Sequence, residues 1–337
     1  MIEILIFAAV STLLYRLGMG PILFLIPLQV LYIRRGKKSF GWAAVLSLVL
    51  IIVIGLVLTR RWTTGEALTS ATALSLQMPS LVFELTIVAL MIGGLALIQL
   101  PEMNPELRLP RYPRVTRLVL VTGISGILSV PIILYLTGNE AFTASIEEFF
   151  STLVGATNSA ISSTQSEALP IATQPIQTES LLRFISMVMR RTYLFYYFLI
   201  LTFGWWLGTI IGVRSMGRHP DLTRIADFKL PDRYVWPLIA SLALVVLNLL
   251  VPLEPLEILA WNALLIFVFL YGISGLGIVR FLLKKLKVRP GVRWLLIIGI
   301  IILALTPRIG IAVLILIPGL GVSEVWLKYR REERSNI

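Results

Sequence analysis

Long apolar runs, separated by short polar stretches, recur along the whole chain. Many reach roughly 18 residues, the length at which a helix can cross the apolar core of a membrane. Only helices and closed barrels satisfy their own backbone hydrogen bonds within lipid. The pattern therefore predicts an all-α fold, a polytopic transmembrane helical bundle of about eight to ten helices. The apolar segments cover residues 2–17, 21–33, 40–58, 81–100, 118–137, 193–213, 236–252, 259–283, 294–306 and 309–326.

The number of helices is open at both ends of the chain. The first two segments are short and are separated by residues 18–21, and the last two are separated by residues 306–308. Each pair forms either a tight helical hairpin or one kinked span. The sequence does not distinguish these two arrangements.

The composition agrees with a membrane protein and excludes several kinds of site. Hydrophobic residues make up 57% of the chain and charged residues 14%, whereas soluble domains carry about 25% charged residues. Residues 1–337 are therefore predicted to form a single integral membrane domain. The chain has no cysteine and one histidine, His219, which excludes thiolate ligands and a multi-histidine metal site. No metal and no cofactor is expected.

The net charge of +12 is explained by loops that are rich in Lys and Arg. Such loops face the cytoplasm in membrane proteins, so the charge predicts no nucleic-acid partner. Because basic loops alternate with loops poor in Lys and Arg, we expect a multi-pass protein of the bacterial cytoplasmic (inner) membrane with both termini, including the tail 326–337, in the cytoplasm. Arg60 and Arg61 are the exception. The basic clusters lie at 34–38, 108–117, 214–233, 284–293 and 328–334.

The longest segment outside the predicted spans covers residues 138–180 and is acidic. Its first half repeats apolar residues at helical spacing, which predicts an amphipathic helix at the membrane surface or a lid over a cavity. These apolar residues are Phe142, Ile146, Phe149, Phe150 and Leu153. The second half is predicted to be a loop.

Polar residues inside the apolar segments are the candidates for solute binding, because such groups are costly in lipid. The candidates are Glu84, Asn248, Asn262 and Gln29. Together they are predicted to line a pocket that opens to the outside. The alternative for Glu84 is a carboxylate that reaches interfacial water, and for the two asparagines it is hydrogen bonding between helices.

Glycines at helical spacing predict close helix packing. Gly204, Gly208 and Gly212 recur every four residues and form a smooth groove on one helix face. The groove would take a helix of the same chain, a second copy of the chain, or a partner subunit. Gly275 is a further packing glycine.

The tetrapeptide Gly-Ile-Ser-Gly occurs twice, at 123–126 and at 272–275. A serine protease would need a base beside Ser125 or Ser274. His219 lies in a predicted cytoplasmic loop, and no lysine lies within an apolar segment. Helix packing, or an inverted repeat of the kind found in transporters, explains the two copies instead. No catalytic residue is assigned, and the chain is not expected to be an enzyme.

Several short stretches resemble the YybS-like family of predicted bacterial membrane proteins. They are Phe-Lys-Leu-Pro at 228–231, Asn262 at the start of a helix, Gly275, the C-terminal stretch around Glu324, and the proline-containing segment followed by a basic turn at 27–36. That family is distantly similar to the substrate-binding subunits of energy-coupling-factor transporters. The resemblance implies a helical bundle that captures a small solute from outside and docks on a membrane scaffold subunit with its ATPases. The docking pattern Ala-x-x-x-Ala of those subunits is missing, because the first segment has Ala8 and Ala9 without an alanine four residues later.

Two functions of different classes follow from these observations. The first is a substrate-binding or permease subunit for a small solute, with membrane lipids, a scaffold subunit and ATPases as partners. The alternative is a non-transporting scaffold in envelope assembly or division, whose basic loops and tail recruit envelope proteins or anionic lipid. An enzyme acting on lipid-linked substrates comes third, since no acid–base cluster at membrane depth is visible.

Overall fold

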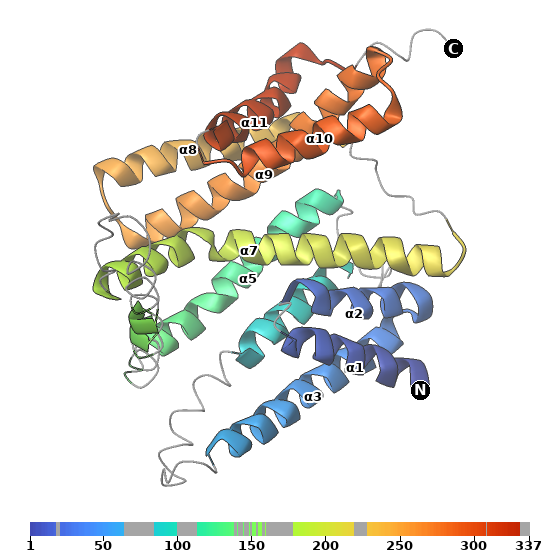
Figure 1. The fold of residues 1–337 in the computed structure, drawn as a ribbon, viewed down its shortest axis with the longest axis vertical. Coiled ribbons are helices and arrows are strands. Elements are labelled where there is room, and N and C mark those ends of the chain that lie inside the picture. The colour runs from blue at the N-terminus through green and yellow to red at the C-terminus, as the bar shows by residue number, and fades with distance from the viewer. Residues whose placement is uncertain are drawn as a thin grey trace. The chain divides into compact units, whose positions relative to one another are not determined.

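The computed structural model describes residues 1–17, 21–63, 84–99, 113–137, 178–218, 228–307 and 309–330, with scattered positions between 140 and 159. All regular elements in this part of the chain are helices, and the described residues include no strand. Figure 1 shows α1 (Ile2–Arg16), α2 (Pro21–Arg35), α3 (Lys37–Thr63), α5 (Arg114–Thr137), α7 (Thr178–Ser215), α8 (Val235–Leu250), α9 (Glu254–Lys285), α10 (Pro290–Ala304) and α11 (Ile309–Leu327). A further apolar helix spans Glu84–Gln99, and a short 3-10 turn, Asp232–Tyr234, precedes α8.

The all-α prediction is confirmed, and each predicted apolar segment lies on a described helix. Six described helices are long and apolar enough to cross a membrane, which agrees with a multi-pass membrane protein. These six are α3, α5, α7, α8 with its preceding turn, α9 and α11.

The two ends of the chain form helical hairpins. α1 packs against α2, and α10 packs against α11, so each pair consists of two separate helices and not of one kinked span. α1, α2 and α10 have 15 residues each. At 1.5 Å per residue such a helix is about 22 Å long, shorter than a hydrocarbon core of about 30 Å.

α7 begins well before the apolar segment predicted at 193–213. This N-terminal part of α7 carries arginines, which interrupt the apolar pattern. Hydropathy therefore does not detect that part of the helix. Arg190 pairs with Glu254 at 2.7 Å and Arg191 pairs with Glu257 at 2.6 Å. The charges that shorten the predicted segment therefore have acidic partners on α9.

Where the sequence predicts one integral domain, contacts divide the chain into two compact units. Unit 1 comprises Met1–Met189 and Tyr196–Pro220, and unit 2 comprises Arg190–Phe195 and Asp221–Ile337. Most of α7 thus belongs to unit 1, whereas its Arg190–Phe195 segment groups with unit 2. The two units are described separately below.

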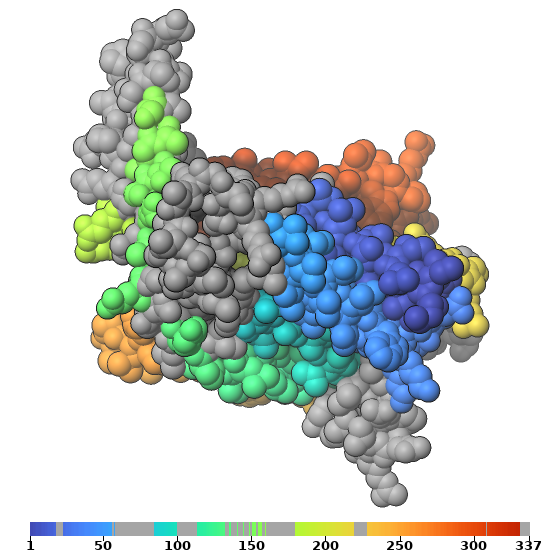
Figure 2. All heavy atoms as spheres, turned by 90° about the horizontal axis from the view of Figure 1, so that it is seen from below, coloured from blue at the N-terminus to red at the C-terminus, as the bar shows by residue number. Residues whose placement is uncertain are grey.

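In unit 1, helices α1, α2 and α3 pack against one another. Their buried side chains include Ala8, Phe24 and Leu28, all fully excluded from solvent. Ser11 Oγ donates a hydrogen bond to the Phe24 carbonyl oxygen at 2.7 Å and ties α1 to α2. The turn to α3 needs Gly36, whose φ of +79° lies in the left-handed region. In the space-filling view the N-terminal helices (blue) present a continuous packed surface (Figure 2).

In unit 2, α9 is the central helix and contacts α8, α10 and α11 (Figure 1). α9 and α11 approach closely at two glycines. A Cβ on Gly275 would meet the carbonyl oxygen of Ile317, and a Cβ on Gly321 would meet that of Tyr271, in both cases closer than real Cβ atoms approach. The two helices thus pack backbone against backbone, as small residues permit in membrane proteins.

Candidate functional site

Polar side chains are buried where helices meet, and each unit has its own set. In the described chain these residues are Ser11, Thr12, Gln29, Ser47, Gln99, Thr122 and Ser125 in unit 1, and Ser241, Asn262, Ser274 and Glu324 in unit 2. Because water cannot satisfy such groups inside a membrane bundle, their partners decide what each of them can do.

A cluster of two amides and a hydroxyl, which we call the amide cluster, lies inside unit 1. It consists of Gln29 on α2, Gln99 at the end of the Glu84–Gln99 helix and Thr209 on α7. Gln29 Nε2 donates to Thr209 Oγ1 at 3.0 Å, and Gln99 Nε2 donates to Gln29 Oε1. Gln99 is 1% exposed, and its Oε1 accepts no hydrogen bond from the described residues. The cluster therefore contains a buried acceptor that a further donor can satisfy.

The predicted glycine groove positions this cluster. A Cβ on Gly204 would lie 2.7 Å from Leu25 Cβ, and a Cβ on Gly212 would lie 2.9 Å from Ile33 Cβ. Between them, a Cβ on Gly208 would collide with the side chain of Gln29 itself. The groove is thus covered by α2 of the same chain, and the absence of side chains lets α7 bring Thr209 beside Gln29.

Glu84 lies apart from the amide cluster, at the opposite end of the Glu84–Gln99 helix. That helix is about 24 Å long at 1.5 Å per residue. Glu84 forms an ion pair of 3.0 Å with Arg16, whose Nη2 also donates to the Ile51 carbonyl oxygen at 2.7 Å. Glu84 and Gln29 are therefore not brought together, although both belong to unit 1.

Asn262, in unit 2, binds the backbone of α7. Its Nδ2 donates to the carbonyl oxygens of Arg190 and Ile258, both at 2.8 Å. Its Oδ1 accepts from the amides of Leu194 at 2.9 Å and Phe195 at 3.2 Å. Arg190 and Leu194 are the two residues that an α-helix normally joins by an i, i−4 bond. Two donors and two acceptors engage both ends of the Asn262 side chain.

Asn248 has a different and more local partner. Its Oδ1 accepts from the amide of Leu253 at 3.2 Å, across the turn that connects α8 to α9. The side chain thus stabilises the start of α9, where the chain turns. Asn248 and Asn262 belong to the same unit but share no partner in the described contacts.

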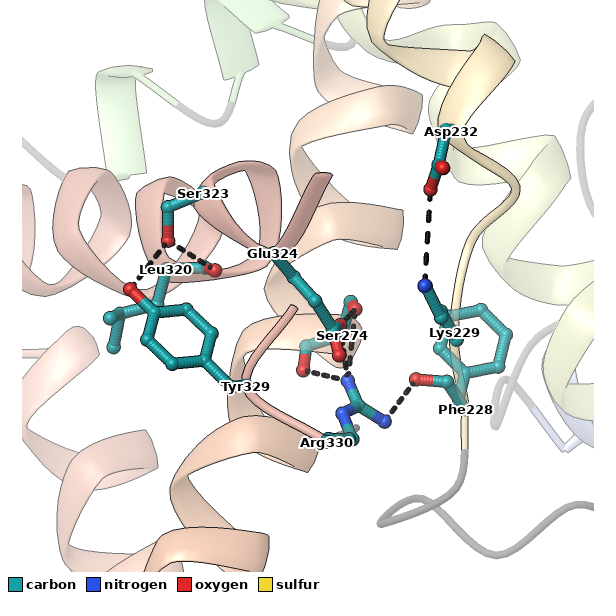
Figure 3. A network of polar contacts seen from close by, with 9 residues as sticks. All are labelled: Phe228, Lys229, Asp232, Ser274, Leu320, Ser323, Glu324, Tyr329 and Arg330. Atoms are coloured by element: carbon teal, nitrogen blue, oxygen red, sulfur yellow. Dashed lines mark hydrogen bonds and ion pairs between the residues drawn. The ribbon is translucent and has the colours of Figure 1, made fainter. Parts of the chain in front are cut away.

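A second polar cluster in unit 2, which we call the C-terminal clamp, consists of Ser274, Glu324, Arg330 and the Phe228 carbonyl group (Figure 3). Arg330 Nη2 lies 2.8 Å from Glu324 Oε2 and donates to the Ser274 carbonyl oxygen at 3.1 Å and to its Oγ at 3.3 Å. Arg330 Nη1 donates to the Phe228 carbonyl oxygen at 2.9 Å. Ser274 Oγ also lies 3.4 Å from Glu324 Oε2. One guanidinium therefore joins α9, α11 and the segment that precedes α8.

Sequence reasoning missed the C-terminal clamp as a site, because it assigned Ser274 to packing and did not single out Glu324 as an intramembrane carboxylate. The signal that could have identified it was Glu324, a single carboxylate inside the last apolar segment. Carboxylates are costly in lipid, so one inside a membrane segment is a candidate functional residue. Ser125, in the other Gly-Ile-Ser-Gly copy, hydrogen-bonds the Tyr197 hydroxyl at 2.7 Å, which in turn donates to the Leu90 carbonyl oxygen. The two serines thus have different partners.

Some predicted features lie outside the described residues. They are His219, most of the segment 138–180 with its predicted amphipathic helix, and residues 331–337 of the tail. Among the residues that the structure does describe, no three acidic or histidine side chains gather into a group that could hold a metal ion.

Comparison with known proteins identifies one family. A family model described as "predicted membrane protein (DUF2232)" matches residues 111–317, which is more than half of the chain. The match includes both Gly-Ile-Ser-Gly copies, Asn248 and Asn262, and it ends before Glu324. No curated protein and no solved structure matches the chain. The chain therefore belongs to the DUF2232 family of predicted membrane proteins.

Proposed function

We propose that this protein is a substrate-binding or permease subunit for a small solute that donates hydrogen bonds. The observation that carries the proposal is the amide cluster of unit 1, in which Gln99 Oε1 is buried without a donor from the described chain. The cluster lies among apolar helices, where an unsatisfied polar group costs several kcal/mol in lipid. A solute with a hydroxyl or amide group would supply the missing donor.

The surroundings of the acceptor favour a neutral polar solute. The neighbouring groups of the cluster are an amide and a hydroxyl, from Gln29 and Thr209, and neither carries a charge. A neutral amide oxygen in a dry site binds a neutral donor without the desolvation penalty of an ion. The resemblance to the YybS-like family and to the energy-coupling-factor subunits supports the same class of function, with a scaffold subunit and ATPases as the partners to be sought.

The first experiment is a gentle-detergent purification of the tagged full chain from its native membrane, with mass spectrometry of co-purifying proteins and small molecules. Recovery of a polar solute, together with ATPases and a membrane scaffold subunit, is the expected result. Recovery of envelope-assembly or division proteins without any solute would overturn the proposal and favour the non-transporting scaffold.

The recovered solute then tests the amide cluster directly, through the Gln99→Leu variant. We expect its affinity to fall at least about fivefold, because a donor left unpaired in a dry site costs about 1–3 kcal/mol. The matched control is Thr122→Val, which also removes a buried polar group, since the Thr122 hydroxyl donates only within its own helix, to the Leu118 carbonyl oxygen at 2.8 Å. Equal affinity in both variants would place the solute elsewhere and refute the role of the cluster.

A further inference from the structure

The turn between α9 and α10 concentrates positive charge. α9 ends at Lys285 and α10 begins at Pro290, so only residues 286–289 connect them. No aspartate or glutamate occurs anywhere between Glu257 and Glu324. The basic residues of the turn and of the adjoining helix ends are Arg280, Lys284, Lys285, Lys287, Arg289 and Arg293.

The charges of this turn are exposed, and the backbone that carries them is held by hydrogen bonds. Lys284, Lys287 and Arg289 are exposed, and no carboxylate of the described chain pairs with them. Three backbone hydrogen bonds close the turn, with donors at Leu286, Lys287 and Val288 and lengths of 2.9 to 3.1 Å. Since the connection is short and hydrogen-bonded, its backbone loses little conformational freedom when the charged side chains meet a ligand.

An apolar wall adjoins the charges. α10 packs against α9 and α11 with one side only, since it has no fully buried residue and most of its residues are exposed. Leu295 and Ile302 are examples of its large exposed residues. At the charged end, Trp294 is exposed and the Arg280 guanidinium lies 5.1 Å from its ring centroid. Tryptophan and arginine at the end of a lipid-facing helix are typical of the headgroup level of a bilayer.

We propose that the α9–α10 turn is a binding site for an anionic phospholipid, whose phosphate meets Lys284, Lys287 and Arg289 while its chains lie along α10. Phosphate oxygens accept strong charge-assisted hydrogen bonds from ammonium and guanidinium groups. A zwitterionic headgroup brings its own cation next to these residues, so the site discriminates in favour of a net negative lipid. α10 is about 22 Å long at 1.5 Å per residue, shorter than the hydrocarbon core, which draws the headgroups toward the turn.

This site is independent of the amide cluster, and it is tested with the full chain in nanodiscs of phosphatidylcholine that contain phosphatidylglycerol as the probe. Native mass spectrometry counts the phosphatidylglycerol molecules that stay bound after the bulk lipid is removed. The test variant is K284Q/K287Q/R289Q. Each basic residue near an anionic surface strengthens binding about fivefold. We therefore expect the affinity of the triple variant for phosphatidylglycerol to be at least tenfold lower than that of the parent chain.

The matched control is K38Q/R214Q/R218Q, which removes three exposed basic residues of unit 1. The control is expected to retain phosphatidylglycerol like the parent chain. Equal loss in both triple variants would mean that any exposed basic residue attracts the lipid, and no loss in the turn variant would mean that the turn does not hold it. Either result overturns the proposal. Should the triple variant fail to fold, the single variant K287Q must still lower retention, since its side chain projects from the connection and not from a helix.

Discussion

Removing the guanidinium of Arg330 is expected to destabilise unit 2 strongly, because it leaves the carboxylate of Glu324 buried without a cation. The Glu324 side chain is 3% exposed and that of Arg330 is 13% exposed. Arg330→Met keeps the length and apolar part of the side chain but removes every guanidinium donor of the C-terminal clamp, so that the Ser274 hydroxyl is the donor left to Glu324. The same change also leaves the carbonyl oxygens of Phe228 and Ser274 without this partner.

The magnitude follows from burial. Breaking a buried ion pair by removing one partner costs about 3–5 kcal/mol, because the remaining charge is uncompensated. An exposed pair is worth far less, about 0.2–1 kcal/mol, since water screens it. Arg183 and Glu179 provide such a pair in the same chain, with an N–O distance of 2.6 Å and side chains 78% and 77% exposed. Judged by distance alone, this pair would be stronger than the pair of Arg330 and Glu324, which are 2.8 Å apart. Judged by burial, it contributes less to stability.

The assay is thermal unfolding of the full chain in one mild detergent, with circular dichroism as the recorded signal. At about 2–4 °C per kcal/mol, Arg330→Met should lower the melting temperature by about 6 °C or more. Arg183→Met, the control, should change it by about 4 °C or less. The variant E324L/R330M should recover part of the loss, because it removes both charges together.

Equal shifts for Arg330→Met and Arg183→Met would refute the reasoning. So would a double variant whose loss equals the sum of the two single losses, since residues in one network are coupled by about 0.5–3 kcal/mol. The intermediate variant Arg330→Lys is expected to lie between parent and methionine. A lysine keeps the charge but cannot donate in the forked geometry that reaches Phe228 and Ser274 at once.

Two further predictions compare matched positions within the chain. Gly275→Ala should destabilise by about 1–3 kcal/mol, because the new methyl group meets a backbone carbonyl that cannot move aside, whereas Gly123→Ala, with open space around it, should be neutral or stabilising by up to about 1 kcal/mol. Asn262→Ala should lower the free energy of unfolding by about 2 kcal/mol or more and speed hydrogen exchange at the amide of Leu194. Asn248→Ala should lower it by under about 1 kcal/mol, because this variant removes one exposed hydrogen bond. Thermal unfolding and amide hydrogen exchange measure these effects. A loss at Gly123 equal to that at Gly275, or unchanged exchange at Leu194, would contradict them.

The helices of this protein were predictable from its sequence. Each predicted apolar segment lies on a helix, since the demand of lipid for satisfied backbone groups acts on every segment separately. One helix start was not predicted. The start of α7 was missed because Arg190 and Arg191 interrupt its hydropathy, and only their pairing with Glu254 and Glu257 shows why a helix tolerates them there.

The partners of the polar residues were decided by tertiary structure. Gln29, Glu84, Asn248 and Asn262 were all recognisable as unusual in apolar segments, but nothing in their spacing showed which of them would meet. Gln29 lies beside Gln99, and Asn262 binds the α7 backbone, while Glu84 pairs with Arg16. Their role in solute binding stays a prediction.

The two Gly-Ile-Ser-Gly copies show the division most clearly. Although the two tetrapeptides are identical, Ser125 lies beside a tyrosine hydroxyl, whereas Ser274 belongs to the ion-pair cluster with Glu324 and Arg330. Burial in a membrane is a property that each segment carries along its own length, so the sequence alone determined where the apolar helices lie. Whether the pairs at the two chain ends are hairpins or kinked spans was decided by the contacts between them. Hydrogen bonds and ion pairs are short and directional, and they join residues far apart in the chain. Only the crossing of helices in three dimensions decided which of these groups lie within reach of each other.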